Sequence, residues 1–444
     1  MLFTASAPRG GLSPIVIGAG ISGLARAVAL VRSGARPIVI DPYVPGGLIR
    51  SALIDGFTLE CGAGTFALTP AMKNLLEILG LEDLMRFPAI EHHRHYVWHD
   101  GSACQVPLDF GSLLNTKLLS LRERFSFMRG FQGKLLMQAP NLTVHDLIST
   151  LFSPHIAEVI AAPMLRGIFG GDTRALLARL VFPKLFEHLR RGGTVLQYMQ
   201  AQKSSGGRKI FTLQGGNEEL VKGCLRYLEG KSELTRGVVT GLEYESTSKT
   251  FSLTLNSGVT LSSNSVHIAT SGEGTASYIG KLSNTLAGAL QKVRYAPLAV
   301  YHVALPRDVK LPRAGFGILV PPGEGDLVLG LLFNSQLFPH SAPATKHLAT
   351  VCLGGIGGES VLKSSAAELE AALRAATKKY LGFDSPQILK STLWARGIPQ
   401  YESVLLDVHT EMEKIERAYP SLCFIGADRG GIGVPARVDV ALRL

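Results

Sequence analysis

The hydrophobic pattern near the start of the chain is that of a strand, a helix and a second strand. Residues 14–17 form a short apolar run, and residues 22–33 place apolar side chains at helical spacing. Residues 37–41 form another apolar run that ends in Asp41. A glycine-rich turn separates the first run from the helical segment. This order predicts a βαβ unit, in which two parallel strands lie side by side under the connecting helix.

Further along the chain, segments with helical spacing alternate several times with segments typical of strands. Residues 72–80 have helical spacing with a glycine stop, and residues 94–107 alternate as two strands around a turn at Asp100-Gly101. From residue 110 to about 203 the spacing is helical with few β-branched runs, which predicts an all-helical insertion. We further expect a glycine turn and a helix in "LQGGNEELVKGCLRYL", short strands at 238–268 and 299–334, a helix at 365–380 and a final strand in "LCFIGA".

The first glycine-rich turn has the form G-x-G-x-x-G. Gly18 permits a tight turn, Gly20 lets backbone N–H groups approach a pyrophosphate, and Gly23 lets the helix pack close to the strand. Asp41 ends the next strand, where a carboxylate can accept hydrogen bonds from a ribose. The strand, helix and acid together predict dinucleotide binding. The alternative is a glycine-rich turn in an unrelated α/β fold.

A second glycine turn favours FAD over NAD as the bound dinucleotide. "PGGLIR" supplies Gly46, Gly47 and Arg50 directly after the first βαβ unit, and "FTLECGAGTF" follows with Glu60 and Gly62. An NAD dehydrogenase would continue into another βαβ unit. The last strand and its turn, "IGADRGGIGVPA", then return to close over the flavin, with a helix N-terminus facing the end where negative charge develops on reduction.

Composition narrows the class of protein. The 444 residues predict two or three domains, and 46% of them are hydrophobic against 18% charged. The 45 Lys and Arg exceed the 35 Asp and Glu, which leaves a net charge of +10 and suits an anionic ligand or an acidic membrane surface. No long Lys/Arg block is present, so we expect no nucleic-acid partner.

Cysteine and histidine usage argues against a metal. The five cysteines are scattered without a C-x-x-C pair, which is typical of a reducing compartment and of a chain without zinc or disulfides. The histidines of "HHRHYVWHD" are His92, His93, His95 and His99, and an exposed polar loop explains them better than a metal site. The start of the chain lacks a signal peptide pattern, and no apolar span is long enough to predict a transmembrane helix.

Residues 115–137 combine basic and apolar side chains. Five cations oppose one acid, Glu123: they are Lys117, Arg122, Arg124, Arg129 and Lys134. The apolar residues between them are Leu118, Leu119, Leu121, Phe125, Phe127, Phe131 and Leu135. A basic amphipathic helix lying on a membrane surface fits this composition, and a helix packed on its own domain with a solvated basic face is the alternative.

Four further motifs carry a family resemblance. They are "LRGIFGGDTRALLARLVFPKLF" at 165–186, "LPRAGFGILVPP" at 311–322, "VCLGG" at 351–355 and "GIPQY" at 397–401. With the two nucleotide turns, the chain resembles the oxygen-dependent protoporphyrinogen oxidases of haem synthesis from about residue 14 to 440. General flavin amine oxidases share the nucleotide turns but not this set.

The resemblance implies site residues. Together with the glycine turns it implies FAD contacts at Gly18, Ala19, Gly20, Ile21, Ser22, Gly23, Asp41, Gly47, Leu48, Arg50, Gly62, Ala63, Gly64, Thr65, Val239, Ala427, Ile432, Gly433 and Val434. It implies substrate contacts at Arg94, Arg166, Gly167, Phe316, Leu319 and Cys352, with Gly167 and Arg94 closest to the catalytic step. The chain departs from the family pattern at Cys352, where a larger thioether is familiar, and at Leu48, where an aromatic can occur.

The residue types suit these roles. A porphyrinogen is a wide apolar macrocycle with two propionates, so it needs flat apolar walls, which Phe316 and Leu319 would provide, and a cation, which Arg94 would provide. Gly167 would let the macrocycle approach the backbone. Without the family, Phe316 and Leu319 would be ordinary core residues and Arg94 an ordinary surface residue.

The chemistry implied is dehydrogenation of a tetrapyrrole at a meso carbon, repeated in three two-electron rounds. Non-covalent FAD takes the electrons, and dioxygen reoxidises it with release of hydrogen peroxide. No side chain stands out as an obligatory general base, so the protein mainly positions the reactants. Further partners that the resemblance admits are ferrochelatase or another haem-pathway enzyme, and a second copy of the chain. The expected location is the inner face of the bacterial cytoplasmic membrane or the mitochondrial inner membrane.

We therefore expect an α/β chain (α+β overall). It would combine a Rossmann-like FAD-binding domain of the amine oxidase/hydroxylase type, a mixed-sheet substrate domain and an all-helical membrane-binding insertion. The FAD-binding parts are 1–90, 204–290 and 405–444, the substrate parts are 91–109 and 291–404, and the insertion is 110–203.

Three other functions stay open at this point. The first is a coproporphyrinogen III oxidase of the same fold, acting on a tetracarboxylate. The second is an amine oxidase or carotenoid desaturase. The third is a catalytically silent FAD-fold protein that escorts lipids, although such proteins tend to lose the glycine pattern that is intact here at both ends of the chain.

Overall fold

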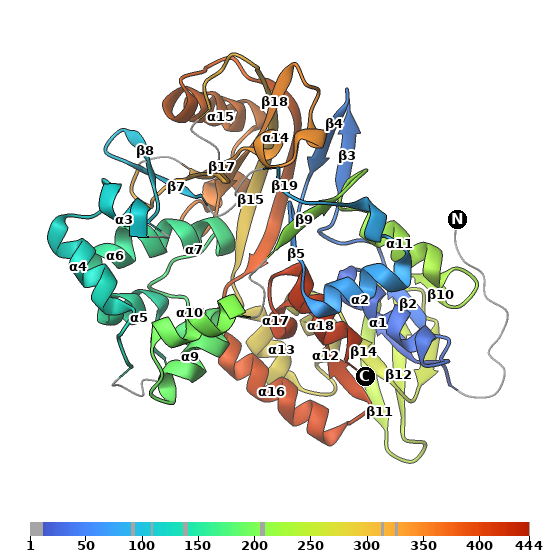
Figure 1. Ribbon diagram of the computed structural model, residues 1–444. Helices are drawn as coiled ribbons and strands as arrows, with labels where there is room; N and C mark the ends of the chain where they lie inside the picture. The colour runs from blue at the N-terminus through green and yellow to red at the C-terminus, as the bar shows by residue number, and fades with distance from the viewer. Residues whose placement is uncertain are drawn as a thin grey trace.

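The computed structural model consists of two sheet-containing parts and a helical part (Figure 1). It describes residues 12–89, 94–107, 110–135, 141–204, 209–311, 315–324 and 327–443. In the view of Figure 1 the helical part lies on the left, a large sheet at the top, and a parallel sheet with its helices at the lower right. Strands from distant parts of the sequence meet in both sheets.

The parallel sheet has five strands in the order β10-β2-β1-β14-β20. All four neighbouring pairs are parallel. The strands are β1 (Ile15–Ile17), β2 (Ile38–Asp41), β10 (Glu233–Arg236), β14 (Val266–Ile268) and β20 (Leu422–Phe424). Helix α1 (Ile21–Arg32) connects β1 to β2, so the predicted βαβ unit is confirmed.

Successive residues of these strands point into two different cores. Val16 and Val39 pack with helices on one face, whereas Ile15, Ile17 and Ile40 pack on the other. The first face is covered by α1 and by α2 (Pro70–Leu79), α11 (Glu219–Leu228) and α18 (Val434–Leu442). The second is covered by α12 (Gly272–Ile279), α13 (Asn284–Gln291), α16 (Val404–Ala418) and the small sheet of β11 (Val239–Glu245), β12 (Thr250–Leu255) and β13 (Thr260–Ser263).

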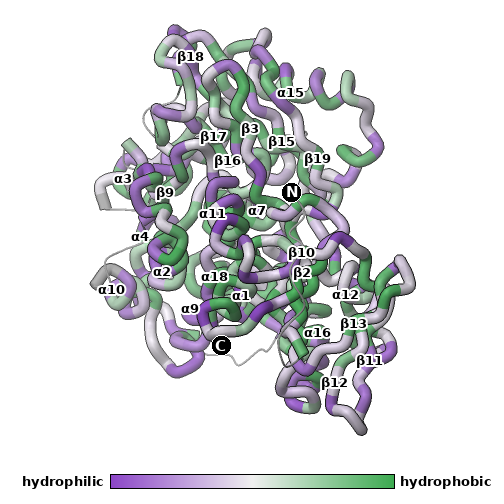
Figure 2. The backbone as a smooth tube through the Cα atoms, turned by 90° about the vertical axis from the view of Figure 1, so that its right-hand side faces the viewer, coloured by the Kyte–Doolittle hydropathy of each residue, from purple (hydrophilic) through white to green (hydrophobic). Residues whose placement is uncertain are grey.

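The two ends of the chain meet on the first face. Helix α18 packs along α1 and also against α2. Figure 2 shows α18 beside α1, whose tube is largely coloured as hydrophobic. The C-terminal glycine turn therefore lies at the same edge of the sheet as the N-terminal one.

The second large sheet has seven strands in the order β19-β15-β18-β17-β16-β7-β8, and only the β16–β7 pair is parallel. The strands are β7 (Tyr96–His99), β8 (Ser102–Gln105), β15 (Tyr295–Pro306), β16 (Gly317–Leu319), β17 (Val328–Leu332), β18 (Lys346–Gly354) and β19 (Gln387–Pro399). One face packs on α15 (Ala366–Leu381) through residues such as Val303, Val351 and Leu373. The other face of this sheet packs against α7.

Every element described between residues 110 and 204 is helical, as predicted. These are α3 (Phe110–Asn115), α4 (Leu121–Gly130), α5 (Val144–Leu151), α6 (Pro154–Ile156), the π-helical η2 (Ala157–Ala161), α7 (Ala162–Phe169), α8 (Ala178–Val181), α9 (Pro183–Arg190) and α10 (Val195–Ser204). The remaining elements are β3 (Ser51–Ile54), β4 (Phe57–Glu60), β5 (Phe66–Ala67), η1 (Glu82–Leu84), β6 (Met85–Arg86), β9 (Ile210–Leu213), α14 (Asn334–Leu337), η3 (Pro339–Ser341), η4 (Glu359–Leu362) and α17 (Ala427–Gly430).

One expectation in this region was wrong in its extent. Residues 115–137 do not form one helix, because α4 is a separate helix that begins after Ser120. Ser120 and Glu123 form a reciprocal capping box, which starts a new helix at this position. Arg124 donates to the carbonyls of Leu119, Leu114 and Thr116 and so closes the preceding loop.

Candidate functional site

The N-terminal and C-terminal glycine turns both meet the segment that follows β14, the strand between β1 and β20. Gly18 has φ +104°, and a Cβ on it would lie 3.0 Å from the carbonyl carbon of Ala269. A Cβ on Gly426, which follows β20, would lie 2.6 Å from the Thr270 carbonyl oxygen. Because the carboxyl ends of parallel strands share one edge, β14 brings the two turns to the same place.

The other two glycines of the first turn differ in what surrounds them. A Cβ on Gly23 would lie 1.8 Å from the carbonyl oxygen of Gly18, so this position requires glycine if α1 is to pack on the turn. A Cβ on Gly20 would meet no atom within 4 Å. Gly20 therefore borders open space at the start of α1, where the predicted pyrophosphate would lie.

Asp41 is held by the backbone around it. The Ala19 N–H donates to Oδ2 of Asp41 at 2.6 Å, and the Tyr43 N–H donates to Oδ1 at 2.8 Å. The carboxylate thus fixes the first glycine turn to the end of β2. A surface cavity of about 170 Å³ begins beside it, lined by Asp41, Tyr43, Val44, Pro45, Leu234, Thr235 and Arg236. This cavity has the position expected for the nucleoside end of a dinucleotide.

The second glycine turn packs on the first. The Gly46 N–H donates to the Ala19 carbonyl at 2.8 Å. Gly47 has φ +58°, and a Cβ on Gly47 would lie 3.4 Å from the Gly20 Cα. Gly62 lies against Leu48 so closely that a Cβ would be 1.7 Å from the Leu48 carbonyl oxygen. Arg50 donates to the Gly47 carbonyl at 3.2 Å.

The remaining predicted cofactor residues extend this cradle. Asn217 donates to the Ala63 carbonyl at 2.8 Å, and Gly64 and Thr65 lead from there into β5. Val239 is buried at the start of β11, two residues after Gly237 donates to the Asp41 carbonyl at 3.3 Å. Ala427 begins α17, and the sequence Ile432, Gly433, Val434 leads into α18.

These features fit a bound dinucleotide. Neither α1 nor α18 has a capping side chain or an acidic residue in its first turn, so the first backbone N–H groups of both helices, except at Pro435 of α18, which has none, suit phosphate or an electron-rich ring. Gly20 and Gly64 add no side chain to the space between the turns. The assignment of each residue to a cofactor atom stays a prediction.

The sequence analysis named Glu60 in "FTLECGAGTF" but assigned no role to this partly buried carboxylate next to the cradle. Glu60 accepts from the Ser51 hydroxyl at 2.7 Å and from the Asn217 N–H at 2.9 Å. Burial raises the pKa of Glu60 to about 7, the two hydrogen bonds oppose this rise, and the nearby Glu218 adds to it. Asn217 lies 157 residues from Glu60 in the sequence and Glu218 follows it, so no local motif predicts the cluster.

Strand register brings two predicted substrate residues, Leu319 and Cys352, together, and α7 adds a third, Gly167. Leu319 pairs with Gly330, and Gly330 pairs with Cys352, so these residues form a row across β16, β17 and β18 with their side chains on one face. Gly167 on α7 faces this row, since a Cβ on it would lie 2.5 Å from Cδ2 of Leu319. Burial raises the pKa of the Cys352 thiol to about 11, which keeps it neutral.

Phe316 and Arg94 meet at the edge of the same sheet. The Phe316 N–H donates to the Arg94 carbonyl at 2.8 Å, and the Phe316 ring lies 5.2 Å from the ring of His95. The Arg94 side chain is exposed. Arg166 donates to the carbonyls of Val320 and Val328 at 3.1 and 2.8 Å, so it ties α7 to the sheet in addition to any role toward substrate.

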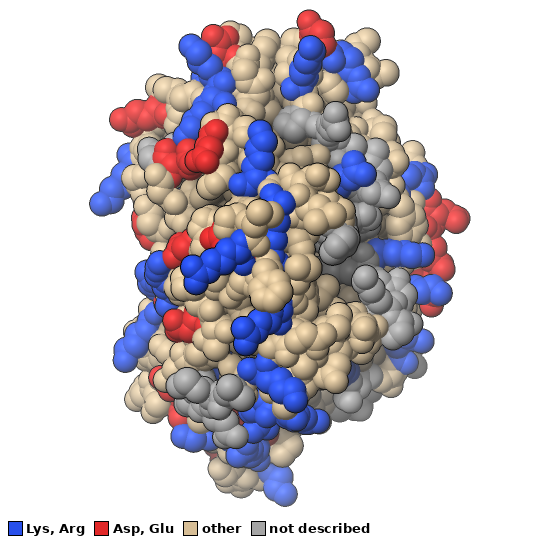
Figure 3. All heavy atoms as spheres, turned by 60° about the vertical axis from the view of Figure 1, so that its left-hand side comes forward, with Lys and Arg blue, Asp and Glu red and all other residues tan. Residues whose placement is uncertain are grey.

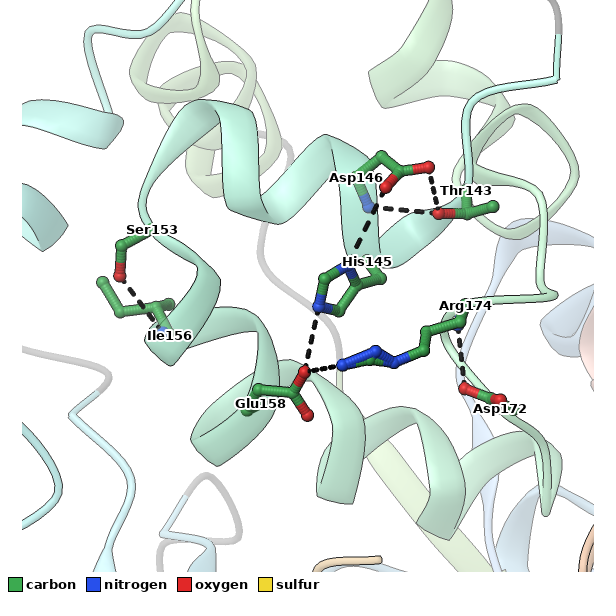
Figure 4. A network of polar contacts seen from close by, with 8 residues as sticks. All are labelled: Thr143, His145, Asp146, Ser153, Ile156, Glu158, Asp172 and Arg174. Carbon is green, nitrogen blue, oxygen red and sulfur yellow. Dashed lines mark hydrogen bonds and ion pairs between the residues drawn. The ribbon is translucent and has the colours of Figure 1, made fainter.

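A polar network fixes the loop that follows α7 (Figure 4). Glu158 on η2 accepts from Arg174 and lies 3.0 Å from Nε2 of His145 on α5. The Arg174 N–H donates to the Asp172 side chain at 2.9 Å. The "GGDTR" part of the motif at 165–186 thus ties the loop after α7 to η2 and α5.

The described residues contain no group of three or more His, Cys, Asp or Glu side chains that could hold a metal ion. His92 and His93 lie outside the described residues. His95 stacks near Phe316, and His99 lies 3.5 Å from the Asp100 carboxylate. All five cysteines are free.

Comparisons with known proteins also indicate that the chain binds a flavin. The sequence profile of the flavin-containing amine oxidoreductases matches residues 21–436. A mitochondrial protoporphyrinogen oxidase from Nicotiana tabacum is 28% identical and covers 94% of this chain and 91% of that protein. A coproporphyrinogen III oxidase from Bacillus subtilis is 23% identical and covers 96% of this chain and 95% of that protein.

Solved structures show the same fold. A crystal structure from Exiguobacterium sp. 255-15, assigned provisionally as a protoporphyrinogen oxidase, has a TM-score of 0.81 at 18% identity and covers 98% of both chains. The cyclohexylamine oxidase of Brevibacterium oxydans IH-35A has a TM-score of 0.70 at 17% identity, also over 98% of both chains. The chain belongs to the flavin-containing amine oxidoreductase family and is a flavin-dependent oxidoreductase.

Proposed function

We propose that the chain oxidises a porphyrinogen, with protoporphyrinogen IX as the substrate and dioxygen as the electron acceptor. Relatives named for protoporphyrinogen and coproporphyrinogen oxidation align over nearly its whole length. The single structural observation that carries the proposal is Gly167 facing the row of Leu319, Gly330 and Cys352. Gly167 packs on Leu319, so the helix backbone and the apolar side chains of the sheet lie side by side, which suits a flat, apolar substrate that covers both.

In this mechanism the protein binds and orients, and the bound flavin supplies the electron-accepting chemistry. Leu319 and Phe316 offer apolar surface to the macrocycle, and the Gly167 backbone approaches its pyrrole N–H groups. Arg94 pairs with a propionate by a charge-assisted hydrogen bond. Holding the reacting carbon at a fixed distance lowers the entropic part of the barrier.

Anaerobic reduction of the bound flavin tests the proposal. The purified protein is mixed with protoporphyrinogen IX or coproporphyrinogen III without oxygen, and loss of the oxidised flavin absorbance is followed by stopped flow. Faster reduction by protoporphyrinogen supports the proposal. Faster reduction by coproporphyrinogen would reassign the substrate to the tetracarboxylate, which the Bacillus relative's name makes the second candidate. Reduction by neither would reject both.

We also propose that one FAD is bound per chain without a covalent bond. The open space beside Gly20 and Gly64 accommodates a cofactor held by backbone groups alone. Acid denaturation followed by centrifugation should leave the yellow colour in the supernatant. Colour in the pellet would contradict the non-covalent assignment.

A surface on the helical part supports attachment to a membrane. Leu121, Phe125 and Met128 lie on one side of α4 at positions i, i+4 and i+7, and their side chains are 81, 64 and 43% exposed. Figure 3 shows Lys and Arg side chains gathered on the face that includes this part. The described helices include none that combines the length and the apolar character needed to cross a bilayer. We propose peripheral binding through α4 to an anionic membrane surface.

Vesicle sedimentation tests this surface. The wild-type protein should pellet with vesicles containing anionic phospholipid at low salt, and higher salt should weaken binding. The double substitution Leu121→Ser and Phe125→Ser should lower the vesicle partition coefficient about 100-fold or more, because each buried apolar side chain contributes roughly 1.5–3 kcal/mol. Val259→Ser, on a half-exposed valine in the β12–β13 turn, is the control. Wild-type protein in the supernatant, or a double variant that pellets normally, would contradict the proposal.

A further inference from the structure

The C-terminal glycine turn is anchored through its carbonyl groups by side chains from three elements. Tyr401, just after β19, donates its hydroxyl to the Ala427 carbonyl at 3.1 Å. His409 on α16 lies 2.6 Å from the Asp428 carbonyl through Nε2. Arg437 on α18 donates to the Gly431 carbonyl at 3.2 Å. The backbone of residues 427–431 is therefore fixed by groups that do not themselves belong to the predicted cofactor set.

A fourth anchor, Tyr295, connects this turn to the segment after β14. The Gly272 N–H donates to the Tyr295 hydroxyl at 3.0 Å, and that hydroxyl donates to Oδ1 of Asp428 at 2.8 Å. Gly272 follows Ala269 and Thr270, which contact both Gly18 and Gly426. One hydroxyl therefore connects the segment after β14, which separates the N-terminal and C-terminal glycine turns, with the buried side chain of Asp428 in the C-terminal turn.

Tyr295 is well suited to hold a fixed position. It is the first residue of β15 and pairs with Pro399 of β19, so it belongs to the seven-stranded sheet. The Arg396 guanidinium lies 5.6 Å from its ring centre and forms an ion pair with Glu273 of α12. Burial raises the pKa of Tyr295, and the Asp428 carboxylate adds to this effect, so the hydroxyl stays protonated and remains a donor.

We propose that Tyr295 is a positioning residue for the bound flavin. Through Gly272 and Asp428 it sets the distance between the N-terminal and C-terminal glycine turns. It also connects the seven-stranded sheet to the edge of the parallel sheet where the cofactor would lie. The inference rests on the flavin, which the family assignment supplies, and not on the identity of the substrate. Its failure therefore leaves the porphyrinogen proposal untouched, and the reverse also holds.

Tyr295→Phe keeps the ring and removes only the hydroxyl. The matched control is Tyr301→Phe, a buried tyrosine on the same strand that packs in the core with α15, away from the cofactor. Apoprotein of each variant is titrated with FAD in the absence of substrate. Visible circular dichroism of the flavin-saturated protein reports the environment of the ring, and thermal unfolding of the apoprotein reports the fold.

We expect Tyr295→Phe to raise the FAD dissociation constant about tenfold or more, because a hydrogen bond to a buried carboxylate is lost. We also expect it to change the visible circular dichroism, whereas Tyr301→Phe should change neither. Wild-type affinity and an unchanged spectrum for Tyr295→Phe would overturn the proposal. So would equal losses in both variants, since a general loss of stability would then explain them.

Tyr401→Phe covers the case in which Tyr295→Phe does not fold. It removes a different anchor of the same turn, the bond to the Ala427 carbonyl. If the position of the turn controls flavin binding, this variant should also weaken FAD binding and alter the spectrum. Wild-type behaviour would show that the turn does not need its side-chain anchors, and the proposal would be wrong.

Discussion

The predicted cofactor edge and the proposed substrate face of this protein are built by different means. At the cofactor edge, backbone touches backbone: Gly18, Gly23 and Gly62 each lie where any Cβ would meet a main-chain atom. At the proposed substrate face, residues from three strands and one helix meet, and a Cβ on Gly167 would contact only the movable end of Leu319. At these three positions the cofactor edge tolerates no added atom, whereas the substrate face can adjust. Changes at Gly18, Gly23 or Gly62 should therefore affect the fold, and changes at the substrate face mainly substrate binding.

The strongest test of the cofactor edge compares Gly23→Ala with Gly20→Ala. In Gly23→Ala the new Cβ would lie 1.8 Å from the Gly18 carbonyl oxygen, so α1 must move, at a cost of roughly 3 kcal/mol or more in unfolding free energy. In Gly20→Ala the new Cβ would meet no protein atom within 4 Å, so this variant should fold and lose FAD affinity. Denaturant unfolding and FAD titration measure the two effects. Equal stability of the two variants would contradict the steric argument.

Arg94→Ala tests the substrate face. Loss of a charge-assisted bond to a propionate should reduce kcat/KM for the porphyrinogen about 10- to 100-fold, because such bonds contribute roughly 1.5–3 kcal/mol. FAD content and thermal stability should stay at the wild-type level, since Arg94 is exposed. Arg94→Lys should restore only part of the activity, because a point charge does not reproduce the bidentate guanidinium. Normal turnover, or loss of flavin, would show that the assigned role is wrong.

Glu60→Gln tests the buried carboxylate beside the cradle. The pKa of Glu60 is raised by burial to about 7, so the folded state binds a proton that the unfolded state has already released. Stability should therefore fall as pH rises from about 4.5 to 7, by an amount on the order of 2 kcal/mol. Glu60→Gln should flatten this part of the curve of unfolding free energy against pH. Glu229→Gln, at an exposed residue after α11, is the control, and an unchanged slope in Glu60→Gln would refute the assignment.

The smallest effects are expected from Gly167→Ala, and they should have opposite signs. Alanine replaces glycine inside α7, which should stabilise the fold by about 0.5–1 kcal/mol. The new methyl group displaces Leu319, so KM for the porphyrinogen should rise several-fold. Gly288→Ala on α13, where a Cβ meets nothing within 4 Å, should give the gain in stability alone. A Gly167→Ala enzyme with wild-type KM would remove Gly167 from the substrate site.

Much of the fold was predictable because its signals are local. The strand, turn and helix around Gly18 follow from hydrophobic spacing and glycine, and Gly80 ends α2 with φ +64° as a left-handed stop. The hairpin of β7 and β8 turns at Asp100, with φ +47°. By contrast, the prediction named no helix at 404–418, where α16 lies, and it extended one helix across the capping box at Ser120.

The candidate site divides in the same way. The sequence by itself indicated where the glycine turns lie, because a turn that leaves no room for a Cβ requires glycine at that position. It also determined the family, through motifs of fixed spacing. Only the tertiary structure decided that Ala269 and Thr270 separate the two turns, that Glu60 meets Ser51 and Asn217, and that Tyr295 reaches Asp428. Apart from the Ser51–Glu60 pair of the β3–β4 hairpin, these contacts join residues far apart in sequence, and strand register and parallel order bring them together without any local pattern.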